Sequence, residues 1–515
     1  MNSFWKHSRA IQLTVPLFGV MGCGTPEVFK PESHAEMRGL SPLSVSTDGK
    51  IVDNLDNEVL LRGVNITSLG EYWQGNPDLP PTVPTTEEDF QKMASRGLSV
   101  IRLIVNWSKI EPNRGEIDQR YLDEVEDMVE LAAQYGIYSV IDMHQDAYSA
   151  FIFTPDDEAC PEGSHPGKGW DGAPDWATIT DGLSTCISGE RNSAPAVVAA
   201  WNHFYSNTDG IQDHFVGAWA AVAERFAGRN EVAGYDLLNE PETSMPSTEL
   251  LPIYDNLLVN VINAISEAEA DSEFQHLLFI EPTIPAGDHT MGIVLPDPER
   301  MGVQNKNIVN ATHNYAESIE LDGLSLEQTN ALLVALSQSQ KTGLWIGEYG
   351  FWSTAPDVLA VAERFAADED NNGLGGAWWQ WRQPCGDPHS LHWGDGEWLP
   401  DDVVTHLHGF DCVANVEIGE TDEFLQILGR AYPRVVAGRI SNLESNPHSG
   451  EFLLDGETNH AGQAFVIWTP TANNTHSVEF EGAQDTSVLE VDGGRIISGI
   501  VPETGPYRIH IFSDD

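Results

Sequence analysis

One pattern recurs along most of this chain: a short run of apolar and β-branched residues, then a longer segment with apolar residues at helical spacing. Runs that are apolar along their whole length predict strands buried on both faces, and the helices between them predict parallel strands. We count eight such runs, at residues 58–66, 98–105, 137–144, 231–239, 276–282, 307–315, 343–350 and 373–381. Eight βα units predict an α/β fold, a (β/α)8 TIM barrel with insertions over residues 43–433.

A doubly wound sheet is the alternative to the barrel. That fold usually carries a Gly-rich phosphate turn after its first strand, and "LRGVNITS" is not such a turn. After residue 433 the helical spacing ends, and short β-rich segments such as "QAFVIWT" and "YRIHIF" alternate with turn residues. Residues 434–515 therefore predict an antiparallel β-sandwich, packed on the barrel because no Pro/Ser-rich linker precedes it. We interpret it as a structural domain, with a carbohydrate-binding module as the alternative.

The N-terminus differs from the rest of the chain. Lys6 and Arg9 precede an apolar run that is too short to span a bilayer, so residues 1–22 predict a signal peptide. The run ends in "VMGC", which resembles a bacterial lipobox and predicts lipidation of Cys23, with residues 23–42 as a linker. An ordinary secretory signal with an incidental cysteine is the alternative. We expect an exported protein, lipid-anchored to the bacterial cell envelope or secreted.

Four cysteines remain after Cys23. An even number in an exported chain predicts two disulfides, for which three connectivities exist. Pairing by nearness in the sequence joins Cys160 to Cys186 and Cys385 to Cys412. A metal site is the alternative, but no Cys-x-x-Cys and no close histidine spacing supports it.

The net charge of the chain limits the classes of partner that the protein can bind. It has 26 Lys and Arg against 79 Asp and Glu, for a formal net charge of −53. Because phosphate binding needs clustered cations, this balance excludes a general nucleic-acid binder and indicates a solvated acidic surface. We expect a monomer with no cofactor and no metal.

The C-terminal ends of barrel strands carry the chemistry in this fold. There the sequence presents two glutamates, Glu240 in "YDLLNEPE" and Glu348 in "GEYG". Two carboxylates across a pocket are what glycoside hydrolysis requires, one protonated and one ionised. Arg102 is the candidate for the charge that keeps one of them ionised. Further polar and aromatic candidates at the strand ends are His144, Asn239, His313, Tyr315 and Trp379.

These motifs, with "RGVNITS", "DMHQDAYS", "GAPDWAT" and "YPRVVAG", resemble glycoside hydrolase family 5, and most closely its endoglycoceramidases and glycosylceramidases. The resemblance covers essentially everything after residue 43. It implies a retaining β-glycosidase that cuts between a glycan and ceramide, with Glu240 as acid/base and Glu348 as nucleophile. It also implies that the glycone site is lined by His144, Asp146, Asn239, Tyr315 and Trp379.

One position departs from that pattern. Relatives carry a lysine near the sugar after the first strand, and the corresponding residue here is Glu71, which leaves the glycan open. Glu281 also ends a strand, and we interpret it as a structural acid. Aromatic residues on strand-end loops predict the ceramide side of the site; they are Phe151, Phe153, Trp170, Trp176 and Trp352.

Two other functions stay open. An endo-β-1,4-glucanase or related polysaccharidase would use the same two glutamates. A non-catalytic sugar-binding lipoprotein is less favoured, because dead relatives usually lose a carboxylate and both are present. A serine hydrolase is disfavoured because the chain has no Gly-x-Ser-x-Gly, and a metalloprotease because it has no His-Glu-x-x-His.

Overall fold

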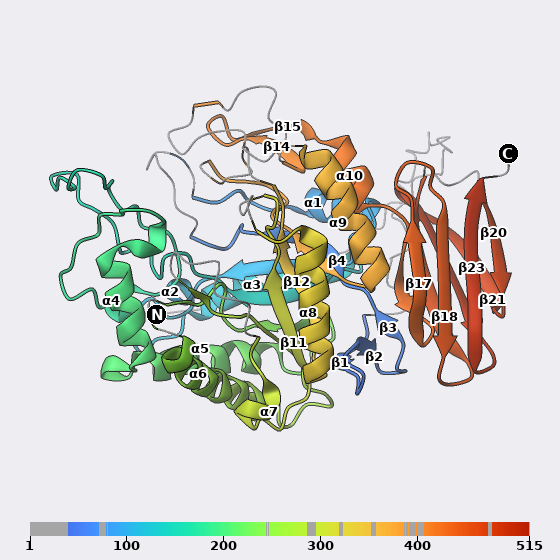
Figure 1. Cartoon of the computed structure of the whole chain (residues 1–515), viewed down its shortest axis with the longest axis horizontal. Helices are drawn as coiled ribbons and strands as arrows, with labels where there is room; N and C mark the ends of the chain where they lie inside the picture. The colour runs from blue at the N-terminus through green and yellow to red at the C-terminus, as the bar shows by residue number, and fades with distance from the viewer. Residues whose placement is uncertain are drawn as a thin grey trace, which may run out of the picture.

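The computed structural model describes residues 40–71, 79, 81–243, 245, 247–285, 295–318, 323–351, 357–385, 387, 390, 397–398, 406–471 and 476–513. Within them the chain forms a closed barrel of parallel strands surrounded by helices, with antiparallel sheets beside it (Figure 1). In the view of Figure 1 the antiparallel sheets lie at the right, on the far side of the barrel from helix α4 (Pro195–Tyr205).

Eight parallel strands close the barrel, and each of them falls within one of the eight apolar runs. In order around the barrel they are β4 (Arg62–Ile66), β5 (Val100–Val105), β6 (Tyr138–Met143), β7 (Val232–Asp236), β9 (Leu277–Ile280), β11 (Ile308–His313), β12 (Gly343–Tyr349) and β13 (Gly376–Trp378). Strand β13 pairs again with β4, so the sheet has no edge. The predicted (β/α)8 barrel is confirmed, and the open doubly wound sheet is excluded.

Helices cover the outside of the barrel. The longer ones are α1 (Glu87–Ser95), α3 (Gln119–Gln134), α5 (Ile211–Phe226), α6 (Ser247–Ala268), α8 (Leu326–Gln340) and α9 (Val358–Asn372), and the shorter ones are α2 (Trp107–Ile110), α7 (Pro298–Met301) and α10 (Asp422–Leu428). Side-chain caps fix where two of them begin. Asp118 accepts hydrogen bonds from backbone N–H groups at the start of α3, and Ser325 does the same for α8.

Helix α4 is one that the sequence pattern does not predict. Its sequence, "PAVVAAWNHFY", is apolar at most positions, and seven of its eleven residues are buried. A helix buried around most of its circumference has no polar stripe, so no helical period can be read from it. It closes a long insertion that follows β6 at the C-terminal end of the barrel.

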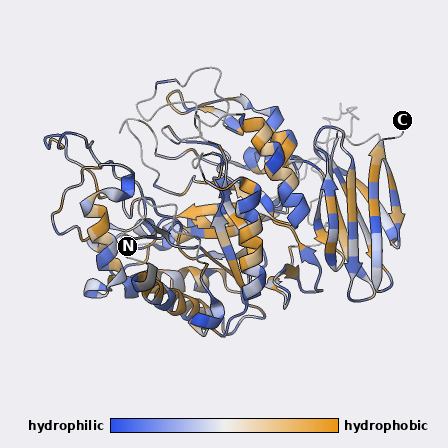
Figure 2. Cartoon of the chain, viewed as in Figure 1, coloured by the Kyte–Doolittle hydropathy of each residue, from blue (hydrophilic) through white to orange (hydrophobic). Residues whose placement is uncertain are grey.

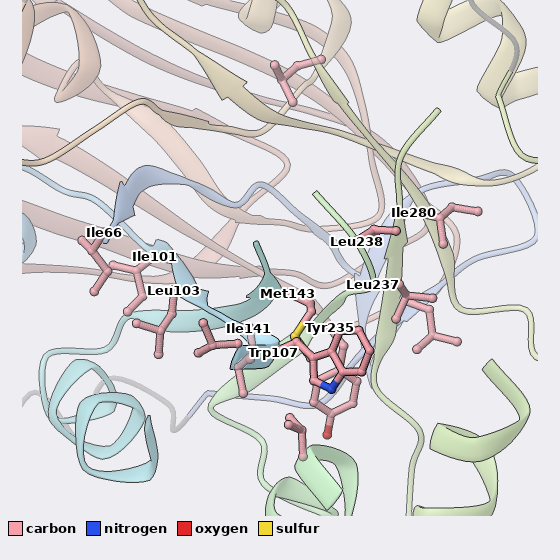
Figure 3. Close-up of a cluster of buried hydrophobic side chains, with 14 of the residues drawn as sticks. Ile66, Ile101, Leu103, Trp107, Ile141, Met143, Tyr235, Leu237, Leu238 and Ile280 are labelled. Carbon is pink, nitrogen blue, oxygen red and sulfur yellow. The ribbon is translucent and has the colours of Figure 1, made fainter. Parts of the chain in front are cut away.

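Alternation along the strands decides what fills the barrel, because successive side chains point to opposite faces. On β5, Ile101 and Leu103 face the helix layer, where they lie with Ile141 of β6 in one apolar cluster (Figure 3). Val100 faces inward instead and joins an apolar floor made of alternate residues from the other strands. Arg102 also faces inward, and it forms the next layer up with polar partners.

The antiparallel part consists of two sheets. A seven-stranded sheet runs in the order β1 (Leu43–Val45), β2 (Ile51–Asp53), β3 (Glu58–Val59), β16 (Tyr432–Val436), β19 (Gln463–Pro470), β22 (Gly494–Val501) and β21 (Gln484–Val491). A four-stranded sheet contains β17 (Arg439–Ser445), β18 (Phe452–Thr458), β23 (Gly505–Ser513) and β20 (His476–Glu481). Buried and more exposed residues alternate along β18, and polar and apolar residues are interleaved in the strands at the right of Figure 2. The predicted β-sandwich is confirmed.

The division of the chain at residues 433 and 434 differs from the observed boundary. Strands β1 to β3 join the sandwich sheet through the pairing of β3 with β16, and the boundary falls inside β16. The predicted single strand 58–66 is in fact two, because the chain leaves the sandwich after Val59 and enters the barrel at Arg62. Both halves are apolar, so the sequence carries no sign of the break.

Close contacts hold the sandwich against the barrel, as the missing linker predicts. Gly97 follows α1 with φ of +80°, and a Cβ there would lie 2.2 Å from the Trp468 indole of the sandwich. The Tyr432 hydroxyl donates a hydrogen bond of 2.8 Å to the Gly97 carbonyl. Only glycine permits both this backbone conformation and this approach.

Both disulfides join the cysteines that are nearest in the sequence. Cys160 is bonded to Cys186, 26 residues away, and Cys385 to Cys412, 27 residues away. The first lies in the insertion after β6. The second ties the segment after β13 to the hairpin of β14 (His408–Asp411) and β15 (Val416–Glu420). In the described part of the chain, no helix combines the length and apolar character needed to span a bilayer.

Candidate active site

Arg102 organises the polar layer of the barrel. It is fully buried and reaches Asn65 Oδ1 (3.2 Å), Asp142 Oδ1 (3.0 Å), Asp236 Oδ2 (2.8 Å), Asn239 Oδ1 (2.9 Å), Glu281 Oε1 (3.0 Å) and Glu348 Oε1 (2.7 Å). Burial alone would lower the pKa of Arg102, but the surrounding carboxylates raise it well above its usual value. Arg102 is therefore a permanent positive charge at the base of the site.

The strand that ends in "DMHQD" supplies two linked side chains. His144 Nδ1 lies 2.7 Å from Asp142 Oδ2, and the imidazole stacks on Trp379 with ring centroids 5.3 Å apart. Burial would lower the pKa of His144, but the Asp142 carboxylate raises it to about 10. The charged ring turns its Nε2 toward Asn239 Nδ2, at 3.5 Å, and thus toward the pocket.

Glu240 follows β7 in a fixed and uncommon conformation. Its φ is +39°, a left-handed value that costs a residue with a side chain about 1 kcal/mol or more. Glu281 Oε2 accepts a 2.8 Å hydrogen bond from the Glu240 N–H, and the Gln145 side chain donates to the carbonyl oxygens of Asn239 and Glu240. These bonds hold the turn that aims the Glu240 carboxylate across the barrel.

Glu348 faces Glu240 from the end of β12. Its Oε2 accepts a 2.9 Å hydrogen bond from the Tyr315 hydroxyl, and its Oε1 is bound by Arg102. One carboxylate oxygen of each glutamate lies within 4.8 Å of the other. Carboxyl groups about 5–5.5 Å apart are typical of retaining glycosidases, whereas inverting enzymes leave about 6.5–9.5 Å for a water.

His313 lies between the two glutamates and shifts their titration. Its Nδ1 is 2.8 Å from Glu240 Oε1 and 3.5 Å from Glu348 Oε2, and its Nε2 is 3.3 Å from Glu281 Oε1. Burial would lower the pKa of His313, but Glu281 and the two facing glutamates raise it well above its usual value. The imidazole therefore carries a proton between two carboxylates.

The pKa directions of the two glutamates are opposite to those that the predicted roles require. Burial raises the pKa of Glu348, against the charges of His313 and Arg102. Burial would also raise the pKa of Glu240, but the hydrogen bond from His313 and the charges of His313 and Arg191 lower it to about 2. The proton that an acid at Glu240 would use is thus held by His313, one hydrogen bond away.

Asp146 stands at the rim with two residues that sequence reasoning does not single out. Burial raises the pKa of Asp146 to about 6 and that of Asp171 to about 7. Asp171 is 1% exposed, and its Oδ2 accepts a 3.1 Å hydrogen bond from Asn106. Arg191 forms an ion pair with Asp146 and lies 3.6 Å from Glu240 Oε2.

The structure brings the predicted site residues into one connected cluster of side chains. The connected set comprises Arg102, His144, Asp146, Asn239, Glu240, His313, Tyr315, Glu348 and Trp379. Trp379 is 5% exposed, and its Nε1 donates to Asp387 Oδ2. Glu281 contacts Arg102 and the Glu240 backbone, and these contacts fit the interpretation of Glu281 as a structural acid.

Other functional residues were missed. They are Asp142, Asp171, Arg191 and Asp236. Asp142 lies two positions before His144, so the period of two along β6 could have found it. Arg191 comes from the long insertion, where nothing in the sequence indicates a contact with the site.

The loop residues predicted for the ceramide side have mixed positions. Phe151 is 45% exposed and Phe153 is 53% exposed, so both present apolar surface. Trp176 packs edge-on against Trp107. Trp352 lies outside the described residues, as do residues 1–39 with Cys23.

Glu71 has local partners in the loop after β4. Its Oε2 accepts a 2.8 Å hydrogen bond from the Ser108 hydroxyl, and its N–H donates to Asn106 Oδ1. Asn106 also binds Asp171. Glu71 is therefore two side chains away from the rim of the pocket.

Two clusters bring potential metal ligands within 4.8 Å of one another. One contains His144, Asp146 and Asp171, and the other Glu240, His313 and Glu348. Metal binding would need each histidine to be neutral. Neighbouring carboxylates raise the pKa of both rings, and a charged imidazole can donate hydrogen bonds to hydroxyl groups.

Comparisons with known proteins agree with this geometry. A family model described as Cellulase (glycosyl hydrolase family 5) matches residues 52–384. Endoglycoceramidase I of Rhodococcus hoagii (strain 103S) is 24% identical over 504 residues, which cover 91% of this chain and 88% of that protein. Endoglycoceramidase of Cyanea nozakii is 28% identical over 465 residues, or 84% of this chain and 82% of that protein.

A solved structure of an endogalactoceramidase superposes with a TM-score of 0.82 at 33% identity, covering 92% of this chain and 100% of that chain. The family model spans more than half of the 515 residues and includes all the barrel strands with their polar ends. The matches to the endoglycoceramidases and to the endogalactoceramidase extend over the sandwich as well. This chain belongs to glycosyl hydrolase family 5 and is a glycoside hydrolase.

Proposed function

We propose that the protein is an endoglycoceramidase-like enzyme that hydrolyses the β-glycosidic bond between a glycan and ceramide with retention of configuration. The observation that carries this proposal is similarity to endoglycoceramidases through both domains, beyond the barrel that all members of the family share. The close spacing of Glu240 and Glu348 supports retention.

In the first step Glu348 attacks the anomeric carbon. Arg102 binds one oxygen of this carboxylate and Tyr315 the other, so the nucleophile is held by two donors. As the new bond forms, the negative charge of Glu348 is lost. The pKa of Glu348 is raised by burial, which makes the desolvated carboxylate more reactive while Arg102 keeps it charged.

Glu240 protonates the leaving oxygen in the same step. Its Oε1 lies 2.8 Å from His313 Nδ1, and the pair holds one proton. A neutral sugar in the pocket displaces water and disfavours the ionised form of Glu240, so the proton passes from His313 to Glu240 and then to the ceramide oxygen.

In the second step water replaces ceramide. Glu240, now ionised, removes a proton from that water, which attacks the anomeric carbon and releases Glu348. The proton taken from water then returns to His313, which gave up its own in the first step, through the 2.8 Å contact with Glu240. Retention follows from two successive displacements at the same carbon.

The glycone is held by groups around the two glutamates. His144 and Asn239 face the pocket together, and Asp146 stands beside them at its rim. The Trp379 ring, backed by the His144 imidazole, offers an apolar face to the C–H side of a pyranose. We propose these four residues as the sugar contacts.

A charge introduced at the exposed aromatic residues tests whether they contact the lipid aglycone. Phe151→Asp and Phe153→Asp should lower kcat/KM for a ceramide glycoside about tenfold or more, because each apolar CH₂ of a lipid withdrawn from water contributes about 0.8 kcal/mol. Cleavage of the same glycan on a small aryl group should change little, since that aglycone has little apolar surface to bury. Product analysis by thin-layer chromatography in detergent measures both.

Leu489→Asp is the matched control, because Leu489 is 52% exposed on β21 of the sandwich, away from the site. It should leave both substrates unaffected. A soluble β-glucan that is cleaved faster than every ceramide glycoside would reject the glycolipid proposal in favour of an endo-β-1,4-glucanase, while the two-glutamate mechanism would stand.

We also propose that the protein is exported and anchored through a lipid on Cys23. Two disulfides support export, because such bonds persist in oxidising compartments. In a bacterial host, mass spectrometry of the N-terminal peptide should show a diacylglyceryl group on Cys23, and Cys23→Ser should release the protein from membranes. An unmodified Cys23 in mature protein would contradict the anchor but not the export.

A further inference from the structure

The insertion after β6 reaches Glu240 through one short segment near its C-terminal end. Its interior is fixed by the Cys160–Cys186 disulfide and by paired backbone hydrogen bonds between His165 and Ile187. A 3-10 turn, Arg191–Ser193, begins five residues after Cys186 and leads directly into α4. The segment is thus held at both ends, by the disulfide on one side and by a buried helix on the other.

Two neighbouring side chains of this turn bind the acid/base segment of the site. The Arg191 guanidinium pairs with Asp146, lies 3.6 Å from Glu240 Oε2, and stacks over the Trp170 ring at 4.8 Å from its centroid. The side chain of Asn192 donates to the Glu242 carboxylate, which is buried.

The Tyr205 hydroxyl of α4 donates a 2.9 Å hydrogen bond to the Glu242 carbonyl. Arg191 and Asn192 therefore contact Glu240 and Glu242, on either side of Pro241, while α4 holds the same segment from behind. A planar guanidinium stacked on an indole and paired with a carboxylate has little freedom left.

We propose that Arg191 is a positioning residue that bridges the sugar-binding carboxylate Asp146 and the acid/base Glu240, and so sets the pH range of the reaction. This inference rests on the proposed function, because it acts through the role given to Glu240. Arg191 reaches Glu240 from a loop, whereas the other groups around that carboxylate come from barrel strands.

The groups that face Glu240 can be named element by element. His313 at the end of β11 and His144 after β6 are cationic, and Glu348 on β12, Glu281 after β9 and Asp146 after β6 are acids. Arg191 is the cation nearest to Glu240 Oε2, as His313 is to Oε1. The charge of Arg191 favours the ionised form of Glu240. This form assists the second step, in which Glu240 acts as a base, but at high pH it limits the first step, in which Glu240 must give a proton.

The direction in which the pH profile should shift follows from the charges around Glu240. Removing the positive charge of Arg191 makes it less favourable for Glu240 and His313 to lose the proton that they share, so the pair stays protonated to higher pH. Because the first step with a poor leaving group needs that proton, the alkaline limb of kcat/KM should move upward by about one pH unit in Arg191→Gln. Arg191→Lys keeps the charge and should restore most of the original limb.

The test measures kcat/KM against pH on a ceramide glycoside and on an alkyl glycoside of the same glycan, with melting temperatures as a check on folding. An aryl glycoside with a good leaving group needs no proton, so its alkaline limb should not move. Arg120→Gln is the matched control, because Arg120 lies on the exposed start of α3 and pairs with Asp118. It should reproduce the wild-type profile.

An Arg191→Gln variant that loses activity equally at every pH would overturn the proposal and leave Arg191 a structural element. The alkyl glycoside keeps this result separate from the proposed function. If neither the wild type nor any variant cleaves ceramide glycosides, the substrate proposal fails. The role of Arg191 fails separately, if the alkaline limb of kcat/KM on the alkyl glycoside does not move in Arg191→Gln.

Discussion

Glu348→Gly should lower kcat by roughly four orders of magnitude or more, because a retaining mechanism cannot begin without its nucleophile. Added azide should restore turnover, since the small anion fits the space of the missing carboxylate and attacks the same face of the anomeric carbon. The product should be a glycosyl azide with inverted configuration, identified by NMR. In the structure this carboxylate accepts bonds from Arg102 and Tyr315, so both donors are in place to receive azide.

Glu240→Ala is the matched comparison at the opposite carboxylate. It should keep cleavage of aryl glycosides with good leaving groups, which need no proton, and should lose cleavage of alkyl and ceramide glycosides. Azide should then give a product with retained configuration, by attack on the glycosyl-enzyme. Unimpaired turnover in Glu348→Gly, or inverted azide products from Glu240→Ala, would reverse or remove the assigned roles.

Arg102→Leu should be the most destabilising single change at the site. It removes the cation that the buried carboxylates of Asp142, Asp236, Glu281 and Glu348 share, and breaking a buried ion pair in this way typically costs about 3–5 kcal/mol of folding free energy. Burial already raises the pKa of Asp236 well above its usual value, and Arg102 opposes that rise. Urea unfolding measures the loss.

The same change should shift the pH profile. Without the positive charge the pKa of Glu348 rises further, so a larger fraction of the nucleophile is protonated and the acid limb of kcat/KM moves to higher pH. Arg62→Leu is the matched control, because it makes the same substitution at another buried arginine of the barrel. Arg62 pairs with Asp370, and Asp370 keeps Arg430 as a second partner when Arg62 is removed. It should cost less stability and leave the acid limb in place. An Arg102→Leu variant as stable as Arg62→Leu, with an unmoved acid limb, would show that the carboxylates are neutralised without Arg102.

The sequence determined the barrel and the positions of its two glutamates. Each apolar run, such as "LSVIRLIV", forms a strand because it can be buried on both faces. Eight such strands that alternate with helices are typical of a closed (β/α)8 barrel, which is the arrangement observed. Glu240 comes at the end of one such run and Glu348 lies near the C-terminal end of another, so local pattern alone places both at the same end of the barrel. The two disulfides also followed from spacing.

Tertiary structure decided what depends on contacts between distant segments. The break between β3 and β4 leaves no mark in "EVLLRGVNI", because the partner that draws β3 into the sandwich, β16, lies more than 370 residues later. Helix α4 has no polar stripe that a sequence pattern could reveal, and Arg191 lies in an insertion without periodicity. Only the folded structure shows that α4 supports the turn that carries Arg191 toward Glu240. The titration of Glu240 was decided in the same way: a carboxylate's pKa depends on which charges surround it, and the nearest one, on His313, is 73 residues away in the chain.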